Sequence, residues 1–117
     1  MRNSSGGGFQ VVATAQLAPV PDVEMSEITV ADTALALVGE AGIEALDAKT
    51  TVVVVQIEAA TVRFTDDGTD PVATTHGFRA YDGQTLIWSV ATAARARFVR
   101  EGGTSAKLKV GQYKHST

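Results

Sequence analysis

The chain has 117 residues, 44% of them hydrophobic, no cysteine and a formal net charge of −3 at pH 7. This length fits one domain with one core, and the absence of cysteine excludes disulfides, thiolate metal sites and cysteine nucleophiles. With no apolar run long enough for a membrane helix or a secretory signal, and with interspersed charges, we expect a soluble cytosolic product whose partners are proteins rather than nucleic acid or membrane.

The N-terminal part of the chain predicts an arm followed by a strand. Residues 1–8 are polar, small and glycine-rich, which favours a flexible arm. Residues 9–17 then alternate apolar and polar side chains until two prolines end the pattern, as in a half-buried strand. This strand could be an edge strand or one exchanged with a neighbouring subunit. Its apolar face therefore supplies three interface candidates, Phe9, Val11 and Ala13.

Residues 23–30 form a weaker strand candidate, and residues 31–46 are ambiguous. Alanine and leucine favour a helix there, with Asp32 as a possible N-cap. Two glycines inside the same segment argue against a long helix. The pattern favours a strand plus a loop, with the helix as the alternative.

From residue 50 onward the alternation is clearer. Residues 52–55 are a continuous aliphatic block, as in a strand buried on both faces. The apolar register inverts after Ala59 and Ala60, which predicts a β-bulge or a sharp bend at these two residues. Residues 62–71 alternate and then end in turn-forming residues, which is typical of a β-hairpin.

Glycine-containing turn signals at residues 66–69, 81–84 and 101–104 separate the remaining short strands. Leu86, Trp88 and Val90 are expected on one inward face, with Trp88 as a core anchor, although tryptophan also suits an interface. Alanine, alternating with arginine, continues a strand pattern through residues 94–98, but residues 91–96 could instead form one helical turn.

These elements predict an all-β protein. The expected architecture is a single antiparallel β-sandwich or a jelly-roll-like small barrel with an extended N-terminal arm. In this division residues 1–8 are the arm, residues 9–113 the sandwich domain and residues 114–117 a tail.

The candidate chemistry is limited. Asp66, Asp67 and Asp70, with Glu58 nearby, contain the oxygen ligands that calcium prefers, but the spacing is not that of an EF-hand and favours turn chemistry. His76 and His115 are far apart in the sequence, and no nucleophile motif surrounds any serine. We therefore expect no catalytic residue, no metal and no cofactor.

Basic side chains alternate along the last two predicted strands. Placed on either side of the turn at residues 101–104, they could form a stripe that meets an acidic protein surface, or simply a solvated sheet face. The residues are Arg95, Arg97, Arg100, Lys107 and Lys109. We take Arg95, Arg97, Lys107 and Lys109 as interface candidates.

One segment carries a family resemblance. Residues 53–71 contain a strand ending in a Gln-x-Glu sequence, then a Val-Arg-aromatic sequence, then an Asp-Gly turn followed by proline. This order resembles small virion structural proteins of tailed bacteriophages, and with residues 34–37, 97–99 and 106–113 the likeness spans about residues 33–113. It implies a β-sandwich of the kind used for capsid decoration or head-to-tail connectors, and it carries over no functional residue.

The resemblance sets the functional expectation. We expect a structural virion protein, made in the host cytoplasm, that decorates the capsid as a homo-oligomer such as a trimer and contacts the major capsid protein. A head-to-tail connector or tail component is the alternative within the same class. A carbohydrate or cell-surface binding β module is the alternative of another class, and it would need an exposed aromatic platform. An enzyme is the least favoured class.

Overall fold

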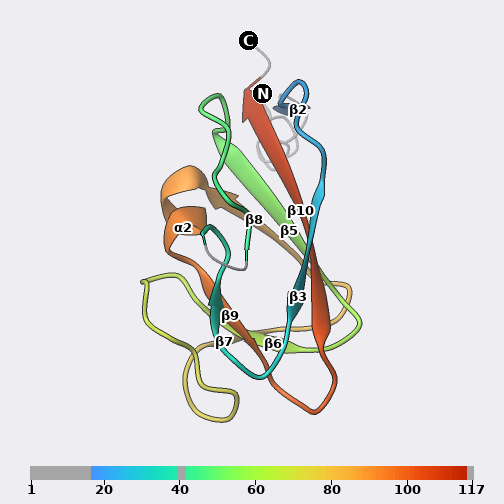
Figure 1. The fold of residues 1–117 in the computed structure, drawn as a ribbon, viewed down its shortest axis with the longest axis vertical. Helices are drawn as coiled ribbons and strands as arrows, with labels where there is room; N and C mark the ends of the chain where they lie inside the picture. Colours follow the sequence, from blue (N-terminus) through green and yellow to red (C-terminus); the bar gives the residue numbers. More distant parts are fainter. Residues whose placement is uncertain (1–16, 40–41, 116–117) are drawn as a thin grey trace, which may run out of the picture.

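The computed structural model describes residues 17–39 and 42–115, and it is mostly β-strand with one short helix (Figure 1). The elements are β2 (Leu17–Pro19), β3 (Ser26–Val30), β4 (Leu35–Ala36), β5 (Val52–Glu58), β6 (Val62–Thr65), β7 (Phe78–Ala80), β8 (Thr85–Ser89), α2 (Val90–Arg95), β9 (Arg97–Arg100) and β10 (Ala106–His115). The expected all-β class is confirmed.

The strands form two antiparallel sheets. In the five-stranded sheet, β10 pairs with β2 and β3 along one side and with β5 along the other, and β5 then pairs with β8. The four-stranded sheet has the order β4-β9-β6-β7. β5 and β10 are the long strands that run side by side in Figure 1. The chain passes repeatedly from one sheet to the other, and β6–β7 is a hairpin within one sheet.

Both sheets contribute side chains to one hydrophobic core. Val53, Val55 and Leu108 from the five-stranded sheet and Val62 and Phe98 from the four-stranded sheet are fully buried. Each such side chain contributes about 1.5–3 kcal/mol when it leaves water. The alternation along each strand is therefore what holds the two sheets together.

Three aromatic rings link the two sheets inside this core. The Trp88 ring centroid, from β8, lies 5.4 Å from that of Phe64 on β6 and 5.9 Å from that of Phe98 on β9. These tilted contacts are within the range that aromatic pairs favour. Trp88 is thus a core anchor, as predicted.

The predicted bend at Ala59 and Ala60 is confirmed, and its role differs from that of a bulge. Ala59 adopts a φ of 78°, and the chain leaves the five-stranded sheet at Glu58 and joins the four-stranded sheet at Val62. The Ala59 N–H donates to Asp82 Oδ1 at 3.1 Å. The register inverts because the strands belong to different sheets, each of which turns its apolar face to the shared core.

The earlier segments agree with the pattern in outline. β2 ends at Pro19, and β3 occupies the second half of the predicted strand at residues 23–30. The described part of residues 31–46 is the short strand β4 followed by a loop, so the favoured alternative is confirmed. The predicted arm at residues 1–8 and strand residues 9–16 lie outside the described residues.

Two expectations about later strands are wrong. Residues 90–95 form α2, whose Ser89 N-cap accepts from the Thr92 N–H at 3.3 Å, so neither Val90 nor Ala94 lies in a strand, and the alternative of one helical turn near residues 91–96 is the one observed. Alternation in an alanine-rich segment does not exclude a helix, and a serine cap favours one. Residues 52–55 are also buried on one face only: Val53 and Val55 are inaccessible, whereas Val52 and Val54 are half-buried on the outer face.

Candidate functional site

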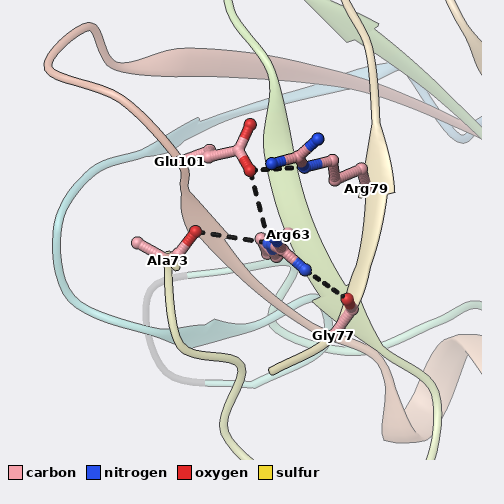
Figure 2. A network of polar contacts seen from close by, with 5 residues as sticks. All are labelled: Arg63, Ala73, Gly77, Arg79 and Glu101. Atoms are coloured by element: carbon pink, nitrogen blue, oxygen red, sulfur yellow. Dashed lines mark hydrogen bonds and ion pairs between the residues drawn. The ribbon is translucent and has the colours of Figure 1, made fainter. Parts of the chain in front are cut away.

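A network of polar contacts centred on Arg63 lies beside the β6–β7 hairpin. Arg63, in the middle of β6, donates from Nε to the Ala73 carbonyl at 3.2 Å and from Nη1 to the Gly77 carbonyl at 2.9 Å. Its Nε also lies 3.4 Å from Glu101 Oε2, which accepts from Arg79 Nε at 2.6 Å. Figure 2 shows Arg63 at the centre of this network, with two carbonyls of the following loop and one carboxylate around it.

The charge of Arg79 is stabilised by its neighbours in this network. The pKa of Arg79 is raised, first by its hydrogen bond to Tyr81 and then by its hydrogen bond to Glu101. An arginine keeps its proton near neutral pH, so the Arg79 guanidinium stays positively charged beside Glu101. Arg63 holds the loop against the sheet through its contacts with two loop carbonyls.

The loop held by Arg63, residues 66–77, has its own polar contacts. Asp67 Oδ1 accepts from the Thr69 N–H at 3.0 Å and from the Thr69 hydroxyl at 2.6 Å. The Thr69 Oγ1 also lies 3.1 Å from His76 Nε2, and the Thr65 hydroxyl donates to the Thr69 carbonyl. The hydrogen bonds from Thr69 lower the pKa of Asp67 below its usual value, and this carboxylate stays ionised as an acceptor.

A shallow hollow of about 300 Å³ lies between this loop and the start of β7. Phe64 and Phe78 line it together with Asp66, Asp67 and His76. Phe78 is 64% exposed although it is aromatic and sits in a strand. The hollow thus combines one apolar wall with acceptor groups, which is suited to binding a surface feature of another molecule.

The alternative of a calcium site is not supported by the geometry. The described residues contain no group of three or more His, Cys, Asp or Glu side chains that could hold a metal ion. Glu58 ends β5 in the five-stranded sheet, whereas the aspartates belong to the loop of the other sheet. Asp67 serves the turn, and Asp70 forms an ion pair with Arg97, so turn chemistry is the better explanation.

The basic interface candidates fall into separate groups rather than one stripe. Arg97 Nε, on β9, lies 2.5 Å from Asp70 Oδ1, in an ion pair without hydrogen-bond alignment. Arg95 Nε donates to the Asp66 carbonyl at 3.4 Å. Lys107 and Lys109 lie on β10 in the other sheet. The expected proximity across residues 101–104 fails because that turn joins two sheets instead of two paired strands.

The lysines have their own acidic partner on β3. Lys109 Nζ forms an ion pair with Glu27, and Lys107 Nζ lies 3.6 Å from Glu27 Oε1. The pKa of Glu27 is lowered, first by the hydrogen bond from Lys109 and then by the charge of Lys107. The pKa of Lys109 is raised by the same bond. Lys107 and Lys109 thus share Glu27, and Arg97 pairs with Asp70, so the candidates on β9 and β10 lie in two separate groups, each with an acidic partner.

The remaining interface candidates, Phe9, Val11 and Ala13, lie outside the described residues. Two other apolar side chains at sheet edges were not predicted from the sequence: Phe78 on β7 and Ile87 on β8, which are 64% and 58% exposed. The sequence indicated an outward position for Ile87, because in a strand its side chain points to the face opposite that of Leu86 and Trp88. For Phe78 the sequence had no such signal.

Comparisons with known proteins add no relative. No helix of the described residues is long and apolar enough to cross a membrane. The chain matches no family model, no curated protein and no solved structure.

Proposed function

We propose that this protein is a structural component of a tailed-bacteriophage virion, and that it decorates the capsid through protein–protein contacts. The resemblance carried by residues 53–71 supports this class. In the structure the same residues form β5, the bend, β6 and the start of the loop held by Arg63. They are a scaffold rather than a site of chemistry, which suits a protein that acts by its surfaces.

The proposal also covers the arrangement of the two sheets and the N-terminal arm. We take the two sheets to be the layers of a β-sandwich, because they share one core and have no strand in common. A closed barrel would have strands that pair across both sheets. Because the two sheets share no strand, we prefer the sandwich to a jelly-roll-like small barrel. Residues 1–8 would be an arm. Of the expected strand at residues 9–17, Leu17 belongs to β2 and pairs with β10 of the same chain, so residues 9–16 would be the part that a neighbouring subunit can accept in a homo-oligomer.

One observation carries the proposal: large apolar side chains are exposed at sheet edges of an otherwise well-packed domain. Phe78 on β7 and Ile87 on β8 are each more than half exposed, while the inward side chains of β5 are inaccessible. Exposed apolar groups at strand edges are typical of protein interfaces. They would be covered when the protein meets its neighbours in a virion.

Co-sedimentation tests the proposal and separates its two forms. The purified full chain is mixed with empty phage heads and, separately, with isolated tails. Saturable binding to heads supports capsid decoration, and binding to tails alone supports the connector or tail alternative. Failure to bind either part refutes the virion role. Deleting residues 1–18 should leave a folded protein that no longer assembles, and normal assembly of this variant would refute the proposed exchange of the arm.

A second candidate function rests on the hollow beside Phe78. An exposed aromatic ring next to Asp67 and His76 gives a stacking surface with polar acceptors, which a carbohydrate-binding module requires. Titration with soluble glycans, followed by NMR of the Phe78 and His76 signals, tests it. Saturable shifts that disappear in Phe78→Ala support this candidate, and unchanged spectra at millimolar glycan refute it.

A further inference from the structure

β8 is an edge strand of the five-stranded sheet. It pairs with β5 through five residues, and no described strand pairs with its other side. Its central residue, Ile87, is 58% exposed, while Leu86 and Trp88 on either side are half-buried toward the core. The strand therefore presents both an open edge and an exposed apolar side chain.

The phase of the backbone hydrogen bonds shows which groups are available at this edge. The Ile57 N–H donates to the Gln84 carbonyl at 2.8 Å, which fixes the hydrogen-bonded positions of the β5–β8 ladder. Two-residue alternation makes Leu86 and Trp88 the next residues bonded to β5. The N–H and C=O groups of Ile87 therefore point away from β5, toward the open side.

The other described edges carry features that discourage pairing. β2, at the opposite end of the same sheet, has three residues and ends at Pro19, β4 has two residues, and β7 has three, including Arg79. β3 carries Glu27, which is held by lysines of β10. β8 has five residues and contains no charged residue and no proline. Such an edge is the kind that accepts another strand, because nothing in it repels or blocks one.

We propose that β8 pairs with β8 of a second copy of this chain, antiparallel about a two-fold axis at Ile87. This inference rests on the proposed function in that it specifies one protein–protein contact of the assembly. The two five-stranded sheets would then become one continuous sheet across the contact.

A second copy is the partner that fits because the strand complements itself. With Ile87 opposite its copy, each Ile87 N–H donates to the carbonyl of the other, in a two-fold symmetric contact. Thr85 of each copy then lies opposite Ser89 of the other, so polar residues meet polar ones and no like charges oppose each other. The two isoleucine side chains meet on the outer face.

The outer face next to β8 extends the apolar contact. Val54 of β5 is opposite Ile87 on one side and Gly111 of β10 on the other. A Cβ on Gly111 would lie 2.9 Å from the Tyr113 ring, so this ring lies close against the glycine. Ile87, Val54 and Tyr113 thus form an apolar row that would join its symmetric copy at the new strand pair.

Analytical ultracentrifugation of the full chain, from about 10 μM to about 1 mM, tests self-association in the range where weak interfaces titrate. The wild type should change from monomer to dimer. Ile87→Lys should weaken dimerisation at least tenfold, because it places two like charges side by side at the axis. Met25→Lys is the matched control, since Met25 is 68% exposed and lies outside the strands, and it should dimerise like the wild type. Circular dichroism confirms the fold of each variant.

Amide hydrogen exchange of the wild type tests the same contact without a substitution. The Ile87 amide should become more protected as the protein concentration rises, whereas the Trp88 amide, already bonded to β5, should not change. A chain that stays monomeric, or a dimer that persists in Ile87→Lys, overturns the inference. Binding to phage heads without β8 pairing would support the virion role and refute the β8 contact. Pairing of β8 without binding to any virion part would support the β8 contact and refute the virion role.

Discussion

Replacing Arg63 with alanine should loosen the β6–β7 loop and destabilise the whole domain. The side chain is 15% exposed and donates to two carbonyls of residues 66–77. A hydrogen bond to a charged group contributes about 1.5–3 kcal/mol, and a half-buried carbonyl left without a partner adds to the loss. Because part of the loss is recovered by water at the loop, we expect Arg63→Ala to lower the free energy of unfolding by about 2–4 kcal/mol.

Urea denaturation measures the change in the free energy of unfolding. Amide hydrogen exchange of residues 72–77 shows whether the loop that Arg63 holds is loosened. Arg79→Ala is the matched control: Arg79 pairs with the same Glu101, but its side chain is 51% exposed and donates to no loop carbonyl. Its loss should be clearly smaller, and it should fall with added salt, since exposed ion pairs are screened. Equal losses for the two variants, or unchanged exchange at residues 72–77 in Arg63→Ala, would refute the role assigned to Arg63.

Three further outcomes follow from the packing and the charges. Phe98→Ala, at a fully buried ring, should cost about 3–5 kcal/mol in urea denaturation; a loss below 1 kcal/mol would contradict the core assignment. The Glu27 carboxyl should titrate by NMR below 4.5, and its pKa should rise toward 4.5 in Lys109→Met; the contribution of this pair to stability is present above the unfolded-state pKa and is lost as the pH falls through the lowered one. Gly77→Ala should destabilise the protein more than Gly68→Ala in thermal melts, because both have positive φ but only at Gly77 would a Cβ lie 2.8 Å from a β6 carbonyl.

The loop at residues 66–77 shows how a local signal acquires its structure from distant residues. The Asp-Gly turn at its start is evident from sequence, and Asp67 indeed accepts from Thr69. The attachment of the loop to the sheet depends on Arg63, which also contacts Glu101 from a distant part of the chain. No pattern in the sequence indicates that one arginine of β6 will bond carbonyls 10 and 14 residues away.

The basic residues show that alternation along a strand does not decide which strand it pairs with. Alternation correctly places Lys107 and Lys109 on one face of β10 and Arg97 out of the core on β9. Whether two consecutive strands pair with each other depends on the whole arrangement of strands. Because β9 and β10 belong to different sheets, Arg97 meets Asp70 while Lys109 meets Glu27.

The sequence by itself determined the all-β class, the inward position of Trp88 and the bend at Ala59 and Ala60. Each of these depends on local alternation and turn chemistry, which act over a few residues. Only the tertiary structure decided which strands are neighbours and that Ile87 lies at an open edge. Those features depend on strand pairing between residues far apart in the chain, and an alternating pattern is the same whichever neighbour a strand has.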